Sequence, residues 1–577
     1  MAGRGGKGSD GRGSKPLRSR VAVVATDSVN PARMGFIMIA FFLMAAVIVM
    51  RLVFLTVIVG PENAAKAQDS RTIYVDVSAK RGTIYDRNGT VLATSVDAKT
   101  IYCNPYEVKD PSGTAAQLAA VLGGDKSDYQ DALVTPDTSF AYVYQKADMD
   151  VAERVADLEL PGIYLLDDVK RVYPCGQTGG QVIGVCDVDG NGLTGLELYY
   201  DDILSGEDGT MIQERGANGY PIAGGLIENE TAVDGQDIVI SLDVEMQEYL
   251  ENRLANAVTA IQGKGGNAIV YDGSTGEILA MATAPFLDPG DRDTYEEPAM
   301  NLTSITTAFE PGSIFKTISM TAAFEELDLT PDTVIFCPAS LPADEYFVTD
   351  AHPRGDEKMS MRTILRDSSN VGMSLTAKQL GFDVLYDKLV DYNLTEATGV
   401  DYPGESAGYL AEPDTWTTIQ CYNVSFGQGV MVTPLQVTRF YGALANDGVE
   451  CTPHFLMAKP QSGEVLEYPT EQVIQNTDAI EPIISMMQSV VESGTGTDAQ
   501  IEGFQPAGKT GTAEFVGSNG LYRTDAYNIS FVGFLPNTNS EIVCFVGVTE
   551  VPGDRLTTPA FKDIMTFAIN HYEITPK

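Results

Sequence analysis

Three short motifs in a fixed order constrain the fold of this chain more than any other feature of its sequence. They are Ser313-Ile-Phe-Lys316, Ser368-Ser-Asn370 and Lys509-Thr-Gly-Thr512. Each motif alone is common, and a second Ser-x-Asn occurs at Ser28-Val-Asn30. The ordered set is far less common, and it predicts a fold that brings three distant segments to one site.

The first motif pairs a serine with a lysine three residues later. A serine hydroxyl needs a base to become a nucleophile. Pro311-Gly312 favour a helix start, and in a helix Lys316 lies on the same face as Ser313. We therefore expect Ser313 at a helix N-terminus with Lys316 within its reach.

Lys316 can serve as the base only if its pKa is lowered. A lysine in water has a pKa of about 10.4, and both burial and a nearby cation lower it. One like charge at about 4 Å contributes roughly 4 kcal/mol, or about 3 pKa units, at an effective dielectric constant of about 20. Lys509 is the candidate for that second cation.

A long apolar run, residues 34–59, is interrupted only by Arg51. It exceeds the roughly 20 residues that span a bilayer, and it is longer than the core of a cleaved signal peptide. Ala65-Lys-Ala67 resembles a cleavage site and keeps that alternative open. We expect an uncleaved anchor, with the stem of Arg51 reaching the interface.

Charge predicts the orientation of this anchor. Residues 1–33 carry seven Lys or Arg and two acidic residues, so we expect a cytoplasmic basic tail and an extracytoplasmic remainder. The net charge of −41 is carried by that remainder, and such an acidic surface argues against a nucleic-acid partner, which would need a basic face. Localisation at the cell membrane through a single pass follows.

Cysteine and acidic patterns predict no metal and no cofactor. The seven cysteines show no zinc spacing, although a disulfide between Cys175 and Cys186 is one alternative. Asp187, Asp189 and Asn191 match the start of a calcium loop. Leu198 stands where the closing glutamate should be, so a glycine-rich turn fits better.

Hydrophobic patterns predict two extracytoplasmic units of an α+β protein. Residues 60–234 read as a mixed α/β module, with a hairpin at Asn88-Gly89. Residues 235–577 begin with a strand at 236–242 and a helix capped by Asp243. Strands at both ends of this unit and helices between them imply one antiparallel sheet closed by both ends.

Longer strings around the motifs carry a family resemblance. After the anchor the chain resembles a class B penicillin-binding protein of the division and spore-cortex type. The strings are Lys80-Arg-Gly82, Asp86-Arg-Asn-Gly89, Arg171-Val-Tyr-Pro174, Gly192-Leu-Thr-Gly-Leu-Glu197, Thr275-Gly-Glu-Ile-Leu-Ala-Met281, Glu310-Pro-Gly-Ser-Ile-Phe-Lys316, Asp367-Ser-Ser-Asn-Val-Gly-Met373 and Ala507-Gly-Lys-Thr-Gly-Thr-Ala513. One departure is Phe286-Leu-Asp-Pro-Gly290, where Phe-Asp-Pro-Asn is usual.

The resemblance implies a non-catalytic pedestal, or dimerisation domain, followed by a penicillin-binding transpeptidase domain with a five-stranded sheet between helical layers. It implies a D,D-transpeptidase that cross-links the D-Ala-D-Ala ends of peptidoglycan stem peptides and is inhibited by β-lactams. A glycan polymerase of the SEDS type and other division or elongation proteins are the implied protein partners.

Roles for the motif residues follow from the same resemblance. Ser313, Lys316, Ser368, Asn370 and Lys509 are the implied catalytic set. Thr510, Gly511 and Thr512 are implied to bind the substrate, and the backbone N–H groups of Ser313 and Thr512 to form the oxyanion hole.

Rival functions fit the sequence less well. None of the three histidines (His352, His454 and His571) stands in a Ser-His-Asp arrangement, so we expect surface or structural roles for them. A glycosyltransferase domain would need a histidine upstream of His352, and a β-lactamase-like hydrolase would need a water-activating glutamate string after Asn370. A non-enzymatic division scaffold and a D,D-carboxypeptidase remain alternatives.

Overall fold

The structure is a computed structural model that describes residues 31–62, 72–215, 221–516, 522–553 and 555–577. The described chain forms two compact units. One contains the N-terminal helix together with residues 212–228, and the other contains residues 76–211 and 229–577. Ser28-Val-Asn30, the Ala65–Ala67 segment and nearly all of the basic tail lie outside the described residues.

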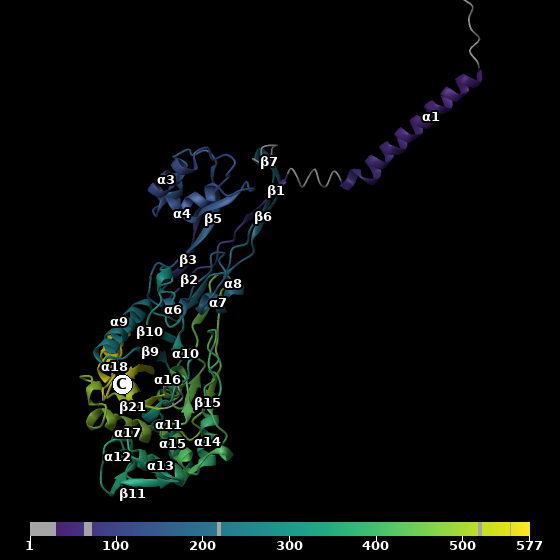
Figure 1. Cartoon of the computed structure of the whole chain (residues 1–577). Coiled ribbons are helices and arrows are strands. Elements are labelled where there is room, and N and C mark those ends of the chain that lie inside the picture. Colours follow the sequence, from purple (N-terminus) through teal and green to yellow (C-terminus); the bar gives the residue numbers. More distant parts are fainter. Residues whose placement is uncertain (1–30, 63–71, 216–220, 517–521, 554) are drawn as a thin grey trace, which may run out of the picture. The chain divides into compact units, whose positions relative to one another are not determined.

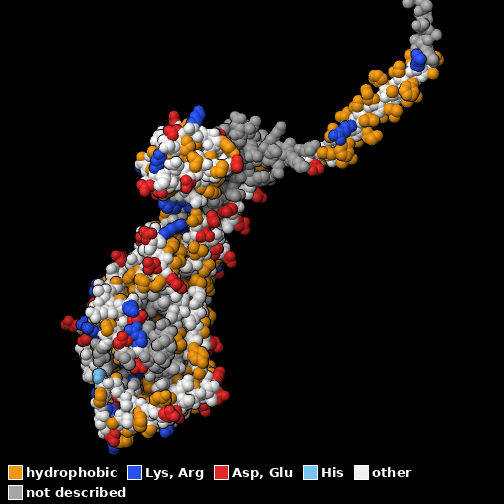
Figure 2. All heavy atoms as spheres, viewed as in Figure 1, with side chains coloured by type: hydrophobic (Ala, Val, Ile, Leu, Met, Phe, Trp, Pro, Cys, Tyr) orange, Lys and Arg blue, Asp and Glu red, His pale blue; other side chains and the backbone are white. Residues whose placement is uncertain are grey.

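The first unit contains the expected apolar helix. Helix α1 (Pro31–Val53) continues as a π-helical turn (Phe54–Ile58), and none of its residues is buried. Together they form one helix of 28 residues, long and apolar enough to cross a membrane. Hydrophobic side chains surround this helix on the visible face (Figure 2). A three-stranded sheet is formed by β1 (Thr72–Val77), β6 (Gly209–Arg215) and β7 (Pro221–Glu230).

The pedestal within the second unit is built on the predicted hairpin. Strands β2 (Ile84–Tyr85) and β3 (Val91–Cys103) pair antiparallel around Asn88-Gly89, which confirms that prediction. Strands β4 (Ala141–Asp148) and β5 (Ile163–Val172) both pair with β3. The described part of this region also contains six short helices: α3 (Pro111–Leu122), α4 (Lys126–Leu133), α5 (Met149–Ala156), α6 (Gly180–Ile183), α7 (Gly195–Tyr199) and α8 (Asp201–Leu204).

The pedestal sheet also contains strands that come from the second domain, residues 235–577. Strand β8 (Ile238–Ile240) pairs parallel with β2 and antiparallel with β18 (Leu456–Lys459), which in turn pairs with β19 (Glu464–Val465). The strand expected at 236–242 therefore belongs to this sheet and not to the second domain's own sheet. Backbone pairing thus ties the pedestal to the catalytic region.

Several strings that carry the family resemblance meet in one buried ion-pair cluster. The carboxylate of Glu197, fully buried, accepts from Arg81 Nε at 2.5 Å and from Arg171 Nε at 2.8 Å. Arg81 also bonds Asp201 at 2.6 Å. Breaking such a cluster leaves charge buried without a partner, so these residues hold the base of the pedestal together.

The second domain is built on the expected antiparallel sheet. Its order is β10 (Ile278–Ala284), β9 (Gly265–Asp272), β23 (Ile542–Val551), β22 (Tyr522–Phe534), β21 (Ala507–Val516). Helices α9 (Val244–Ala260) and α18 (Thr558–His571) pack against the sheet and against each other, and α16 (Pro434–Ala445) packs on β9, β22 and β23 (Figure 1). Asp243 caps α9 as predicted, accepting from the backbone of Glu245 and Met246. The expected five-stranded sheet between helical layers is confirmed.

The region between β10 and β21 is mainly helical. Its helices are α10 (Thr303–Thr306), α11 (Phe315–Glu326), α12 (Met361–Arg366), α13 (Asn370–Leu380), α14 (Phe382–Asp391), α15 (Thr418–Ser425) and α17 (Ile480–Ser493). Short strand pairs are formed by β11 (Val334–Cys337) with β14 (Glu357–Ser360), β12 (Ser340–Ala343) with β13 (Tyr346–Thr349), β15 (Tyr409–Leu410) with β16 (Val430–Met431), and β17 (Val449–Cys451) with β20 (Thr470–Gln472).

The cysteine and calcium alternatives have structural answers. All seven cysteines are free, so Cys175 and Cys186 are not joined. The carboxylate of Asp187 accepts from the backbone and side chain of Asn191, which closes a turn. Among the described residues no group of three His, Cys, Asp or Glu is placed to hold a metal ion.

Candidate active site

Ser313 lies in a tight turn that leads directly into a buried helix. Residues Gly312–Ile314 form a 3-10 turn, and α11 begins at Phe315. The prediction of Ser313 at a helix N-terminus is confirmed in this form. Ser313 in this turn and Lys316 in the first turn of α11 are three residues apart, a spacing that puts both on one face of a continuous helical segment.

The turn is fixed by contacts on three sides. Gly312 has φ of 57°, and a Cβ on it would lie 2.7 Å from the carbonyl oxygen of Thr512. The Gly312 N–H donates to the carbonyl of Gly427 at 2.9 Å. Buried Tyr441 donates its hydroxyl to the carbonyl of Ile314 at 2.8 Å. Only glycine fits at position 312, since the backbone there is left-handed and touches the third motif.

The three motifs meet at the hydroxyl of Ser368. Lys316 Nζ donates to the Ser368 carbonyl at 2.7 Å and to Asn370 Oδ1 at 2.7 Å, and it lies 3.1 Å from Ser368 Oγ. Lys509 Nζ donates to the same Ser368 Oγ at 3.0 Å and to the Thr510 carbonyl at 3.0 Å. Four of the predicted catalytic residues thus form one hydrogen-bonded cluster. The direct contact of Lys316 with the Ser313 hydroxyl stays a prediction.

Both lysines are fully buried, which changes their proton affinity. Burial, followed by the positive charge of Lys509, lowers the pKa of Lys316 well below its ordinary value, against a smaller opposing effect of Asp350. Burial lowers the pKa of Lys509 to about 7. Desolvation is thus the first cause for both lysines, and the like charge expected from the sequence is the second cause for Lys316 alone.

Asp350 organises the second motif and was missed by sequence reasoning. Its carboxylate accepts from the Ser369 hydroxyl at 2.9 Å and from the Val371 N–H at 3.0 Å, and it pairs with Arg354 at 2.6 Å. Ser368 itself has φ of 60°, a strained value for serine. Asp350 holds the N-terminus of α13, from which Asn370 reaches the cluster.

The third motif occupies the edge strand β21 of the sheet. In a strand the N–H and C=O of one residue point to the same side, and the sides alternate with period two. The Thr510 carbonyl accepts from Lys509 Nζ, and the Thr512 carbonyl faces Gly312. The backbone N–H of Thr512 therefore also points from the open edge toward the Ser313 turn. The Thr510 hydroxyl lies 2.6 Å from that of Thr495.

The comparisons with known proteins agree with this geometry. A family model for the penicillin binding protein transpeptidase domain matches residues 266–566, and one for the penicillin-binding protein dimerisation domain matches residues 76–240. The chain belongs to the penicillin-binding protein family. The order of the two domains and the names of its relatives place it in class B.

Relatives of this penicillin-binding protein match almost its whole length. A probable peptidoglycan D,D-transpeptidase, PenA, of Neisseria meningitidis is 31% identical over 94% of this chain and 93% of its own. Stage V sporulation protein D of Bacillus subtilis is 29% identical over 94% of this chain and 86% of its own.

Solved structures share the fold. Penicillin binding protein 3 of Mycobacterium tuberculosis, crystallised with aztreonam, matches with a TM-score of 0.68 and 27% identity, covering 87% of this chain and 98% of that one. This penicillin-binding protein therefore has the D,D-transpeptidase fold and activity of its family.

The histidines of the penicillin-binding protein lie outside the lysine cluster. His454 is buried, stacks on Tyr468 and has a pKa lowered by burial. His571 Nε2 lies 2.8 Å from the carboxylate of Asp243 at the start of α9. These contacts are structural, as expected.

Proposed function

We propose that this penicillin-binding protein cross-links peptidoglycan stem peptides through an acyl-enzyme on Ser313, with neutral Lys316 as the base. The observation that carries the proposal is the convergence of two buried lysines on one serine hydroxyl, beside the turn that holds Ser313. A fully buried lysine favours its neutral form, and only that form can accept a proton.

The first half of the reaction forms the acyl-enzyme. Ser313 Oγ attacks the carbonyl carbon of the D-Ala-D-Ala amide while Lys316 Nζ takes the hydroxyl proton. The negative charge on the former carbonyl oxygen is stabilised by the N–H groups of Ser313 and Thr512, at roughly 3 to 4 kcal/mol per donor. The direction of the β21 backbone and the close approach of Gly312 to Thr512 support this oxyanion hole.

The substrate carboxylate is held by the third motif. Burial lowers the pKa of Lys509 to about 7, and a bound carboxylate favours its protonated form. Lys509 and the hydroxyls of Thr510 and Thr512 then supply a cation and neutral donors, the combination that suits a terminal carboxylate. Gly511 keeps this strand close to the nucleophile turn, because a Cβ there would lie 2.9 Å from Ile314 and 2.3 Å from the Ser530 hydroxyl.

The second motif completes proton transfer. The Ser368 hydroxyl contacts both lysines, so it can pass a proton from Lys316 to the departing amine of D-Ala. Asn370 orients the acyl peptide. The amine of a neighbouring stem peptide then attacks the acyl carbon and gives a proton to Lys316. Lys316 passes this proton to Ser313 Oγ as the bond between the acyl carbon and Oγ breaks, which leaves a new amide cross-link and free Ser313.

The same proposal places the active site outside the cell. The apolar helix serves as the single-pass anchor, the basic tail stays in the cytoplasm, and both extracytoplasmic domains face the wall. The two matched domains are a transpeptidase domain and a dimerisation domain, and by the family resemblance a separate polymerase of the SEDS type supplies the glycan strands.

Reconstitution tests the proposal. Full-length protein, a separate glycan polymerase and lipid-linked precursor are incubated, and the digested product is analysed by mass spectrometry. We expect cross-linked fragments and free D-Ala with wild type and with the surface control Ser112→Ala, and neither with Ser313→Ala. Release of D-Ala without cross-links would instead identify a D,D-carboxypeptidase. Products without cross-links or D-Ala would favour the scaffold.

A further inference from the structure

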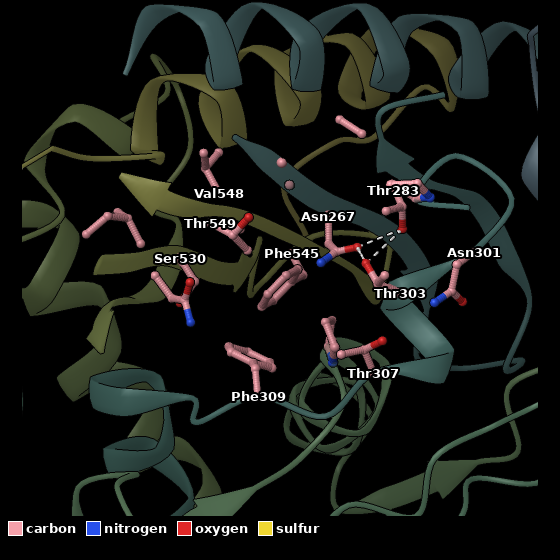
Figure 3. A pocket seen from close by; sticks show the side chains of 18 of the residues that line it. Asn267, Thr283, Asn301, Thr303, Thr307, Phe309, Ser530, Phe545, Val548 and Thr549 are labelled. Carbon is pink, nitrogen blue, oxygen red and sulfur yellow. Dashed lines mark hydrogen bonds between the residues drawn. The ribbon is translucent and has the colours of Figure 1, made fainter. Parts of the chain in front are cut away.

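A cavity with a volume of about 240 Å³ lies beside the active site but is separate from it. It is formed by one end of strands β9, β10, β22 and β23 together with residues 298–309 and the first residue of α16. None of the motif residues lines it. In Figure 3, Thr307, Phe309 and Phe545 lie on the face of the sheet opposite two packed helices, whereas Val548 packs with residues of α9. Such a concave site with a few polar groups is a candidate ligand site in its own right.

The cavity adjoins the catalytic strand. Ser530 and Asn528, both on β22, pair in register with Gly511 and Ala513 of β21. On its other side, Phe309 lies directly before the string Glu310-Pro-Gly-Ser313. A ligand here would therefore sit one strand behind the proposed oxyanion hole.

The lining selects an uncharged ligand. Every described residue that lines the cavity is uncharged, in a protein whose net charge is −41. The polar groups are amides and hydroxyls. The rings of Phe309 and Phe545 pack edge-to-face with their centroids 6.2 Å apart, and they supply an apolar surface. Gly266 and Gly547 also line the cavity, where they contribute backbone atoms and no side chain. The two strands are close together at this point, since a Cβ on Gly266 would lie 2.7 Å from the Gly547 carbonyl oxygen.

The amide of Asn267 is oriented by three hydroxyl groups. Its Oδ1 accepts from Thr283 and Thr303 at 2.7 Å each and from Ser304 at 3.1 Å. A reversed amide could not satisfy three hydroxyls, because its nitrogen carries only two hydrogens. The NH₂ group is thereby turned toward the open space, as Figure 3 shows.

Asn528 supplies the complementary group. Its Oδ1 is buried and has no hydrogen-bond partner in the described chain. A buried acceptor without a partner is costly, and Asn528 is one of the residues that line the cavity, so a ligand donor that reached Oδ1 would remove that cost. Asn267 and Asn528 together offer one donor and one acceptor, the pair that an amide group requires.

We propose that this cavity binds an amide group of peptidoglycan, with its carbonyl on the Asn267 NH₂, its N–H on Asn528 Oδ1 and the apolar carbon next to its carbonyl against the two phenylalanine rings. The identity of the polymer rests on the proposed function. The group comes either from an N-acetylated sugar of the glycan or from a carboxamide of the stem peptide, and both have the same amide chemistry.

Direct binding separates this site from catalysis. Full-length protein in detergent is titrated with tetra-N-acetylchitotetraose and with the dipeptide alanyl-glutamine, followed by calorimetry and saturation-transfer NMR. The matched ligands are fully deacetylated chitotetraose and alanyl-glutamate, which lack the acetamide or replace it by a charge. We expect saturation of the acetyl methyl for the glycan source, or binding of only the amidated dipeptide for the peptide source.

Three variants locate the binding. Thr307→Trp fills the space from an exposed position, and Asn528→Leu removes the acceptor; each is expected to weaken binding about ten-fold. Thr566→Trp, the same change on the exposed face of α18, is expected to leave it unchanged. Asn528→Leu is also expected to raise Tm, because no protein hydrogen bond to Oδ1 is lost.

Two results would overturn the inference. One is binding of neither amidated probe, and the other is equal binding by wild type and the two cavity variants. Because no turnover is measured, an inactive Ser313 would not produce either result. A folded Thr307→Trp or Asn528→Leu protein is recognised by an unchanged or higher Tm, so loss of binding cannot be mistaken for unfolding.

Discussion

Replacement of Lys509 by methionine should move the pH dependence of Ser313 acylation upward by about 2 pH units. Methionine keeps the length of the side chain and removes its charge, so Lys316 no longer faces a second cation. The pKa of Lys316 then rises, so Lys316 becomes neutral, and able to act as a base, only at higher pH.

The magnitude follows from the Ser368 contacts. Lys316 and Lys509 each lie about 3 Å from Ser368 Oγ, so their nitrogens are at most about 6 Å apart. Two unit charges at about 6 Å interact by roughly 3 kcal/mol at an effective dielectric constant of about 20, which is about 2 pKa units. The separation of about 4 Å expected from the sequence corresponds to a larger shift of the Lys316 pKa, about 3 units. Burial of Lys316 remains in the variant, so its pKa stays below the ordinary value.

The assay uses p-nitrophenyl acetate, a neutral ester without the carboxylate that Lys509 is proposed to hold. The burst of p-nitrophenol against pH gives the midpoint for wild type, Lys509→Met, Lys509→Arg and Lys316→Ala. Lys509→Arg retains a charge and should keep a midpoint at or below that of wild type, although the arginine fork reduces penicillin acylation. Lys316→Ala should show no burst. An unchanged midpoint in Lys509→Met would refute the electrostatic role of Lys509.

Other predictions concern stability and anchoring. Burial raises the pKa of Glu251 to about 7, so the wild type loses stability as pH rises from about 4.5 to about 7. Glu251→Gln should remove this loss, which amounts to at most about 3 kcal/mol. The difference in Tm between the variant and wild type should therefore widen as pH rises over this range. Glu197→Ala leaves Arg81 and Arg171 buried without their shared partner and should lower the free energy of unfolding by about 3 to 5 kcal/mol in urea titrations, with exposed Glu153→Ala as the neutral control. The protein should remain in membranes after a carbonate wash, and a mature N-terminus at Gln68 would contradict the uncleaved anchor.

Local sequence patterns predicted the five-stranded sheet of the second domain and the position of Ser313 at a helix N-terminus. The strands of the sheet are apolar runs with turn residues between them, and α9 has a capping Asp243 followed by apolar residues at helical spacing. The clustering of Lys316, Ser368, Asn370 and Lys509 was predicted from motif order and family resemblance. Such features depend on neighbours in the sequence or on a recognisable string.

Features that depend on distant pairing were not predicted. Strand β8 carries the same apolar pattern whether it joins the catalytic sheet or pairs with β2 of the pedestal, so the sequence could not choose between them. Asp350 lies on a loop with no motif of its own, and only the folded chain brings it to Ser369. The dominance of burial over the like charge at Lys316 likewise depends on packing that the sequence does not display.

The central claim is that Ser313 is the nucleophile, and intact-mass spectrometry after incubation with benzylpenicillin tests it most directly. A β-lactam presents an amide and a carboxylate like those of D-Ala-D-Ala, and its opened ring stays on the serine. We predict one adduct per chain on wild type and on Ser112→Ala, and none on Ser313→Ala. An adduct that persists on Ser313→Ala would contradict the account and place the nucleophile elsewhere.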